Sequence, residues 1–247
     1  MEDATDFAEL LTNGSDEPLH PDLQECLCLG GPFPMLSHPL MHVPYFSPIE
    51  NKMMNKMYAQ KLKAKEEFLA SKKWDRLLYL IERPYRFDAF SEYQDQMSDK
   101  EYWSNLAWVY YDSENIHEFD FIPELLLSDR PGREHMMTES GQQTLAEMPE
   151  TVTVYKGFNS SCAWDGDFSF TTEKKVARWF AKRFGIPGPK ILIGTILKSD
   201  ILAYLDGRGE FEILAQPEKV TVTTIRHLKR DPSKATTGGE IFKLLNN

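Results

Sequence analysis

Two glutamates near the C-terminal end, Glu210 and Glu212, are separated by a single residue. Residues 209–214 have the composition of a β-strand, in which alternate side chains face the same way, so we expect Glu210 and Glu212 to project together. Phe211 and Ile213 would then point to the opposite face. Like charges on one face of an apolar strand oppose each other, which makes the pair costly for stability. Two such carboxylates can stabilise a developing positive charge and position a nucleophile beside it. The alternative is a solvent-facing strand edge that carries two ordinary glutamates.

A lysine lies near the end of a second strand-like segment, residues 152–157. The period of two places Lys156 on the same face as Val152 and Val154. A lysine at the end of an apolar face usually extends its ammonium group into solvent. If Lys156 instead lines a cleft, it offers a point charge for a phosphate, and Gly157 allows a ligand to approach the backbone.

A third segment places two small hydroxyls on one face of a strand, Ser169 and Thr171, with Phe168 and Phe170 on the other. Hydroxyls that face inward can orient a ligand or a neighbouring carboxylate through short hydrogen bonds. Exposed residues that merely favour β-structure are the alternative.

The elements that would position these residues are predicted from hydrophobic spacing. Helix formers dominate residues 50–83, and seven lysines between Lys52 and Lys73 make one face of this helix basic. Ser98 and Glu101 form the pattern of a capping box, which starts a helix. Residues 121–148 read as short helices interrupted by prolines. From residue 151 the pattern is β. The predicted strands are Thr151–Phe158, Phe168–Thr171, Ile191–Leu197, Glu210–Ala215 and Val220–Ile225, with one helix at Glu173–Phe184.

This order predicts an α+β protein, with a helical N-terminal half followed by a strand-rich half. Charge divides the chain further, because residues 1–50 hold nine Asp and Glu and no Lys or Arg, whereas the whole chain has a net charge of -10. We therefore expect an acidic, proline-rich flexible arm over residues 1–49. A helical lobe over residues 50–147 and a strand-rich core over residues 148–247 would follow.

Composition excludes several classes of protein. No apolar run approaches the roughly 20 residues that span a bilayer, and a secretory signal is absent, so we expect a cytoplasmic protein. The three cysteines and six histidines show no ligand spacing, so we expect no metal. Residues 51–247 are close to neutral, which makes nucleic acid a poorly supported partner.

Taken in order, these motifs resemble the Arg-Ser-Glu class of mono-ADP-ribosyltransferases, and in particular uncharacterised phage and bacterial members. The likeness extends over roughly half of the chain, and its weak motifs become fairly specific through their order. It is carried by Val154-Tyr155-Lys156-Gly157, Ser169-Phe170-Thr171, and residues 112–115, 129–133, 176–181, 202–205 and 207–212.

The resemblance implies a helical N-terminal lobe followed by a split, mostly antiparallel two-sheet core, together with a reaction and a role for each residue. Such enzymes cleave the bond between nicotinamide and ribose in NAD through an oxocarbenium-like transition state, and they need no metal. Glu212 would stabilise the sugar cation and bind a ribose hydroxyl, while Glu210 would orient or deprotonate the acceptor. Residues assigned to NAD binding are Lys156, Gly157, Ser169, Phe170, Thr171 and Phe180, with Ser169 also holding Glu212.

The implied acceptor is a macromolecule of the host, most simply a protein arginine, and a phage effector or a bacterial toxin fits equally well. Lys156 stands where the family usually has arginine; it keeps the charge and lacks the planar fork that clamps phosphate. This departure keeps an alternative open. The chain could be a catalytically inactive protein of the same fold that binds a partner through its acidic arm or its basic helix.

Overall fold

The computed structural model describes residues 17–113, 121–161, 164, 166–207 and 209–229. The chain divides into two units, residues 1–114 and 115–247. Both helices and antiparallel sheets are present, which confirms the predicted α+β class. The boundary between the units lies after residue 114, whereas the sequence predicted it after residue 147. No helix among the described residues is long and apolar enough to cross a membrane.

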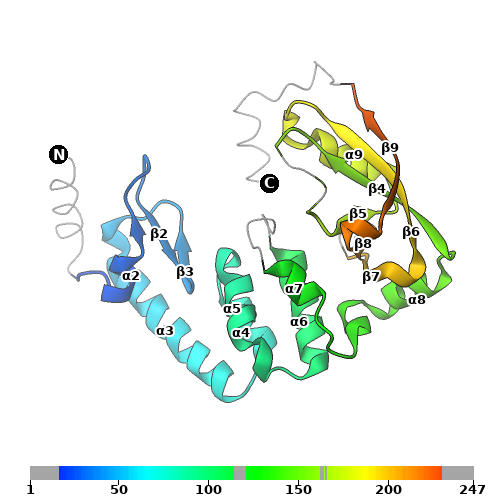
Figure 1. Cartoon of the computed structure of the whole chain (residues 1–247). Helices are drawn as coiled ribbons and strands as arrows, with labels where there is room; N and C mark the ends of the chain where they lie inside the picture. The colour runs from blue at the N-terminus through cyan, green and yellow to red at the C-terminus, as the bar shows by residue number, and fades with distance from the viewer. Residues whose placement is uncertain (1–16, 114–120, 162–163, 165, 208, 230–247) are drawn as a thin grey trace. The chain divides into compact units, whose positions relative to one another are not determined.

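The flexible arm expected over residues 1–49 differs from what the structure shows, because its described part, residues 17–49, is folded. It forms a short helix and a three-stranded antiparallel sheet in the order β1-β2-β3 (Figure 1). Residues 1–16 lie outside the described part. The bounds are α2 (Pro21–Glu25), β1 (Leu27–Cys28), β2 (Met35–His38) and β3 (Met41–Val43).

Acidic residues of this segment are used in packing, which explains why their charge misled the prediction. The Glu17 carboxylate accepts a hydrogen bond from Asn55 at 2.6 Å, and that of Asp22 accepts one from Tyr58 at 2.8 Å. Both donors belong to the following helix. Leucine side chains complete the contact, since Leu23 and Leu36 are fully buried. The flexible arm was predicted from the charges of this segment, and the spacing of its apolar residues was not considered.

Helices make up the rest of the first unit. The predicted run 50–83 is divided at residues 71–73, where Lys72 has a positive φ of 51°. The predicted capping box is present, with the Ser98 hydroxyl accepting from the Glu101 amide and the Glu101 carboxylate accepting from the Ser98 amide. The elements are η1 (Pro48–Glu50), α3 (Asn51–Ala70), α4 (Trp74–Leu80), η2 (Arg83–Tyr85), α5 (Arg86–Tyr93), η3 (Gln94–Gln96) and α6 (Asp99–Asp112).

The second unit begins with the short helices that the sequence predicted between residues 121 and 148. They are α7 (Ile122–Leu126), η5 (Arg133–Met136) and α8 (Glu139–Glu147). Their side chains pack against the strands that follow, since Met137, Leu145 and Met148 contact the core of the sheet. This packing is the physical reason why these helices group with the strands and not with the helical lobe of the prediction.

A six-stranded antiparallel sheet, in the order β7-β8-β5-β4-β6-β9, forms the body of the second unit. The predicted two sheets are thus one among the described residues, although β4 and β5 are joined by a single pair, Tyr155 opposite Thr171. Five strands match the predicted segments within a few residues, and the sixth, β7, was not predicted. The strands are β4 (Thr151–Phe158), β5 (Ser169–Thr171), β6 (Lys190–Leu197), β7 (Ile201–Leu205), β8 (Glu212–Ala215) and β9 (Thr221–His227). Short 3-10 turns η7 (Lys198–Asp200) and η8 (Pro217–Lys219) precede β7 and β9.

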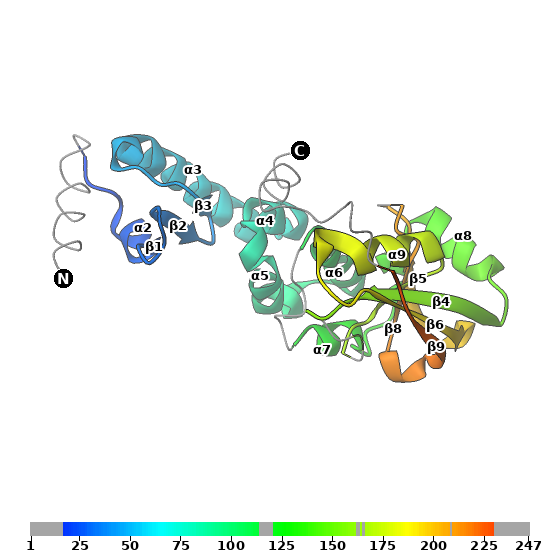
Figure 2. The same cartoon turned by 90° about the horizontal axis from the view of Figure 1, so that it is seen from above.

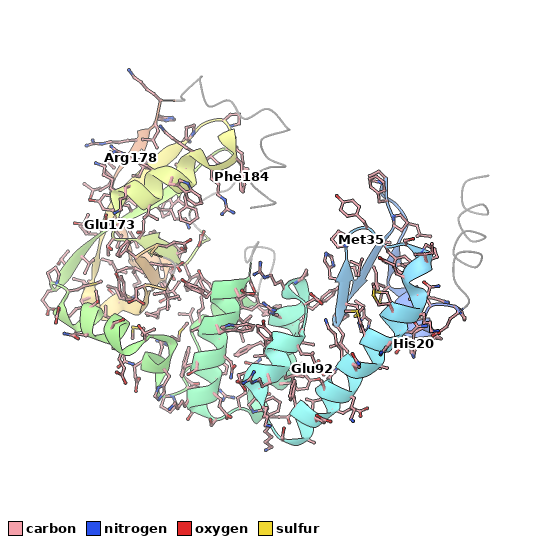
Figure 3. The ribbon with its side chains drawn as sticks, turned by 180° about the vertical axis from the view of Figure 1, so that it is seen from behind. His20, Met35, Glu92, Glu173, Arg178 and Phe184 are labelled. Carbon is pink, nitrogen blue, oxygen red and sulfur yellow. The ribbon has the colours of Figure 1, made fainter. Side chains whose placement is uncertain are left out.

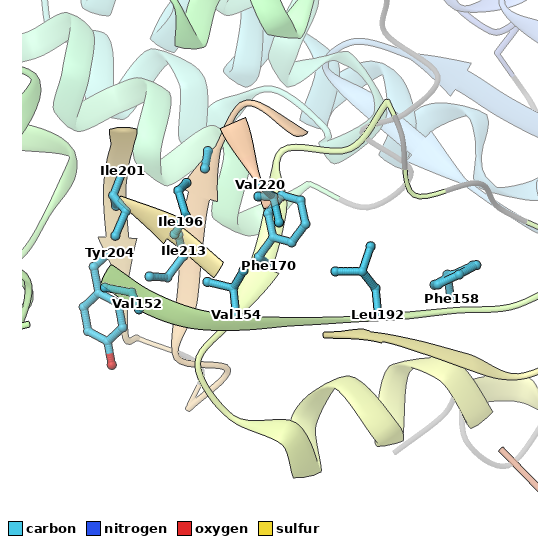
Figure 4. Close-up of a cluster of buried hydrophobic side chains, with 11 residues drawn as sticks. Val152, Val154, Phe158, Phe170, Leu192, Ile196, Ile201, Tyr204, Ile213 and Val220 are labelled. Carbon is cyan, nitrogen blue, oxygen red and sulfur yellow. The ribbon is translucent and has the colours of Figure 1, made fainter. Parts of the chain in front are cut away.

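The two faces of this sheet differ. One carries the apolar core, in which Val154, Phe170 and Ile213 from three adjacent strands are almost fully buried (Figure 4). On the other face lies α9 (Lys174–Lys182), which is followed by the turn η6 (Arg183–Gly185) (Figure 2). The predicted helix Glu173–Phe184 therefore ends two residues early, because Phe184 has a positive φ of 61°.

Candidate functional site

Ser169 and Glu212 meet on the face of the sheet that also carries α9. Thr171 lies opposite Glu212 on one side and opposite Tyr155 on the other, so these three side chains share a face. Ser169, two residues before Thr171, shares it too. From this diagonal position the Ser169 hydroxyl donates a hydrogen bond to Oε1 of Glu212. The serine and the carboxylate that the sequence assigned to one site are therefore in direct contact.

Glu212 is a buried carboxyl, with only 8% of its surface exposed. Burial raises the pKa of this carboxyl to about 7, the hydrogen bond from Ser169 counteracts the rise, and the nearby Glu210 adds to it. Near neutral pH both the protonated and the ionised forms are therefore populated. Perturbed carboxyls of this kind occur preferentially at functional sites, because protein environments that hold a reactive group shift its titration.

Glu210 does not lie on the same strand as Glu212, which corrects the geometry predicted for the pair. Strand β8 begins at Glu212, and Phe211 has a positive φ of 50° that breaks the alternation of faces. Glu210 belongs instead to the loop before the strand, and its side chain is half-buried. The charge of Glu210 nevertheless contributes to the raised pKa of Glu212.

Thr171 holds the loop that carries Glu210. Its hydroxyl donates to the Glu210 carbonyl at 2.6 Å and accepts from the Glu173 amide at 3.0 Å. The Thr172 amide adds a hydrogen bond to the Phe211 carbonyl at 3.1 Å. Thr171 thus connects the start of β8 with the start of α9. This contact fixes the backbone around the unusual φ of Phe211.

Lys156 is paired with Asp167, a residue that the sequence reading missed. Its ammonium group forms an ion pair with Oδ2 of Asp167, and its side chain is 11% exposed. Oδ1 of Asp167 accepts from the Ser169 amide at 2.9 Å, which links Lys156 to the serine that contacts Glu212. A signal for Asp167 existed, since an aspartate two residues before a strand position commonly forms this side chain–backbone turn.

Gly157 serves packing, which corrects the role suggested by its lack of a side chain. A Cβ atom at this position would lie 1.7 Å from the Ala177 carbonyl oxygen and 2.7 Å from the Ala181 amide nitrogen. The backbone of α9 therefore occupies the space that the prediction reserved for a ligand. Only glycine permits this close approach of a helix to a strand.

Phe170 and Phe180, both predicted to contact NAD, lie in different surroundings. Phe170 is 2% exposed and belongs to the core face, and the Lys156 ammonium lies 6.0 Å from its ring centroid. Phe180 is half-buried on α9, where its ring packs edge-on against Trp179 at 4.9 Å. Within the described residues, no three His, Cys, Asp or Glu side chains are grouped to hold a metal ion.

The first unit contains a separate hollow of about 560 Å³ between α4 and α6. Aromatic side chains and charges of both signs line it, among them Trp74, Tyr79, Trp108, Arg76 and Lys100. The sequence reading placed no functional residue in it. Its mixed charges and open shape indicate no particular chemistry, so the Glu212 site remains the better candidate.

Comparison with family models, with curated proteins and with solved structures found no match to this chain.

Proposed function

We propose that this protein is an NAD-dependent mono-ADP-ribosyltransferase that transfers ADP-ribose to a macromolecule of the host cell, with a protein arginine as the acceptor. The observation that carries the proposal is the contact between Glu212 and Ser169. A buried carboxylate held by a serine, without a cation in direct contact, is suited to a substrate that brings the positive charge. The finer fold assignment, an ADP-ribosyltransferase-like core, is part of this proposal and is supported by the near separation of the sheet between β4 and β5.

In the proposed reaction the bond between the ribose C1′ and the nicotinamide nitrogen breaks, and its electron pair leaves with nicotinamide. Positive charge then develops on the ribose ring. The ionised Glu212 would stabilise this charge and accept a hydrogen bond from a ribose hydroxyl. Ser169 would hold the carboxylate in one orientation, so that little reorganisation is needed in the transition state.

Glu210 would act on the acceptor. A guanidinium nitrogen that attacks C1′ must lose a proton, and the half-buried Glu210 lies close to Glu212 on the loop held by Thr171. Lys156 would contact the phosphates of the dinucleotide, which requires it to exchange or share its ion pair with Asp167.

That ion pair also favours the second candidate function, a catalytically inactive interaction protein of the same fold. A lysine already neutralised by Asp167, with 11% of its side chain exposed, has little charge to offer a phosphate. In this case Lys156 would be a structural residue and NAD would not be consumed.

The deciding experiment is incubation of the purified protein with labelled NAD and a host-cell lysate. The matched variants are Glu212→Gln, which keeps the shape of the side chain, and Glu218→Gln, which makes the same change at an exposed glutamate of the same unit. We expect label on a macromolecule with the wild type and with Glu218→Gln. Loss of at least roughly 10²–10³-fold is expected with Glu212→Gln.

Each other outcome has a definite meaning. Release of nicotinamide without labelling would leave two readings, a glycohydrolase or a transferase whose acceptor is missing from that lysate. Equal activity in a folded Glu212→Gln variant would reject Glu212 as the catalytic residue. No consumption of NAD by the wild type would leave the inactive interaction protein as the function.

A further inference from the structure

Helix α9 and the segment that follows it are rich in positive charge. Residues 174–199 contain seven Lys and Arg and no Asp or Glu, although the whole chain has a net charge of -10. Residues 151–230 as a whole hold 13 basic and 8 acidic residues. The near-neutral balance of residues 51–247, on which the sequence reading relied, therefore hides a local excess of cations.

Helical spacing gathers these cations into one row. Lys175, Arg178, Trp179 and Lys182 follow the spacing i, i+3, i+4 and i+7, so they share one side of the helix, and all four are exposed. We call this row the cationic stripe. Its opposite side is fully occupied, because Ala177 and Ala181 are completely buried against the strand at Gly157. Figure 3 marks Arg178, with Glu173 and Phe184 just beyond the two ends of the helix.

Acidic side chains do little to neutralise the stripe. Glu173 approaches Lys175 to 3.9 Å, and both side chains are largely solvated, so the pair contributes little. Among the described residues, Arg178 and Lys182 have no ion-pair partner. On the edge strand β9, Arg226 lies opposite Ile191, which itself lies opposite Gly157, so Arg226 adds a further cation on the same face of the sheet.

An exposed tryptophan lies within the row of cations. Trp179 is 58% exposed, and the Arg183 guanidinium lies 5.5 Å from its ring centroid. Phe184 is 40% exposed, and its ring centroid lies 4.5 Å from the same guanidinium group. Large exposed aromatic rings are disfavoured in water, and next to cations they form the usual surface on which unpaired bases stack.

We infer that the cationic stripe binds single-stranded nucleic acid. Its cations contact successive phosphates, and Trp179 stacks on a base. The stripe is about 10 Å long, from seven steps of 1.5 Å, which suits a short length of extended strand. A charged helix face without an aromatic ring would fit any polyanion, and Trp179 is the feature that favours bases. This inference concerns the α9 surface alone and does not depend on NAD chemistry.

The test measures binding of the full chain to fluorescein-labelled oligothymidylate and oligouridylate by anisotropy over a range of salt concentrations. The double variant Arg178→Gln/Lys182→Gln removes two cations from the stripe. The matched control, Lys56→Gln/Lys63→Gln, removes two exposed cations from the lysine-rich helix α3. We expect the first double variant to lower the slope of log affinity against log salt by about 1.4, from about 0.7 for each lost phosphate contact, and the control to leave the slope unchanged.

Trp179→Ala separates stacking from charge. It keeps every cation, and we expect it to weaken binding about tenfold without changing the salt slope. Failure of the wild type to bind either oligonucleotide would overturn the inference, as would an equal effect of the two double variants. Displacement of the oligonucleotide by polyglutamate at equal charge concentration would assign the stripe to an acidic protein, and displacement by NAD would assign it to the dinucleotide.

Discussion

Arg86 in the first unit and Glu212 in the second are equally buried, at 8% exposure each, but they have different interaction partners. Arg86 forms an ion pair with Asp112, donates to the Ile81 carbonyl at 2.9 Å and lies 4.7 Å from the Trp108 ring centroid. Glu212 has a hydrogen bond from the neutral hydroxyl of Ser169. A buried charge with a full set of partners contributes to structure, whereas one with a neutral partner keeps the capacity to interact with something else.

The pKa directions express the same difference. Burial lowers the pKa of the Arg86 guanidinium, and the Asp112 carboxylate opposes that effect, so this group stays charged. Burial raises the pKa of Glu212 to about 7, which brings its titration into the range in which cells work. The buried guanidinium of the first unit therefore stays charged, whereas the buried carboxyl of the second unit changes its protonation near neutral pH.

The largest effect on stability is expected at Asp112. Asp112→Ala should lower the free energy of unfolding of the first unit by about 3–5 kcal/mol, because it leaves the Arg86 guanidinium buried without its counter-charge. Urea denaturation followed by tryptophan fluorescence measures this change. NAD consumption per folded molecule should not change. An effect below that of an exposed substitution such as Asp75→Ala would contradict the structural role of the pair.

The pH dependence of Glu212 comes next. Because its pKa in the folded protein is raised from 4.5 to about 7, ionisation opposes folding. The contribution of Glu212 to the unfolding free energy should be highest below pH 4.5, fall as pH rises through this window, and level off above about pH 7, with a total loss on the order of 3 kcal/mol. Glu212→Gln should remove this dependence. The difference in unfolding free energy between the wild type and this variant, measured by urea denaturation at each pH, therefore gives the contribution of Glu212. A difference that does not vary with pH would mean that Glu212 titrates normally.

Activity should have the opposite pH dependence. The proposed reaction uses the ionised form of Glu212, so nicotinamide release should rise with pH to a midpoint near pH 7. Ser169→Ala removes the hydrogen bond that counteracts the rise in this pKa, and we expect the midpoint to move upward by about one pH unit. Ser169→Thr, which keeps the hydroxyl, should restore it. An unchanged midpoint in a folded Ser169→Ala variant would show that this contact does not tune Glu212.

The smallest effect is expected for Lys156→Arg. The guanidinium can keep the ion pair with Asp167, so stability should change by no more than about 0.5 kcal/mol. NAD turnover should be retained or increased, because a planar fork binds phosphate in a bidentate manner. Nicotinamide release measures the turnover, and thermal unfolding measures the stability. Loss of NAD binding without unfolding would show that the assumed role of Lys156 is wrong.

Parts of this architecture could be predicted from the sequence because local rules determine them. The bounds of Thr151–Phe158 follow from alternating β-branched residues, and the helix start at Ser98 follows from its capping box. Strand Ile201–Leu205 was not predicted, because it is buried along most of its length and has no alternation to recognise.

The candidate site was predictable in its residues and less so in its geometry. The period of two correctly relates Ser169 to Thr171, and it fails between Glu210 and Glu212 because Phe211 adopts a positive φ that its residue type does not announce. The ion pair of Lys156 with Asp167 depends on a loop that no local pattern describes. Both features, the φ of Phe211 and the ion pair of Lys156, depend on contacts between segments that are distant in the sequence.

The close contact at Gly157 makes the packing of α9 sensitive to temperature when this residue is changed. Helix α9 packs directly against the backbone of β4 at Gly157, where even a methyl group would overlap the Ala177 carbonyl. The helix connects to the site through Thr171, whose hydroxyl accepts from the amide just before its first turn. The variant Gly157→Ala should therefore be temperature-sensitive. It should fold at low temperature, and on warming α9 should detach from the sheet and displace the loop that carries Glu210.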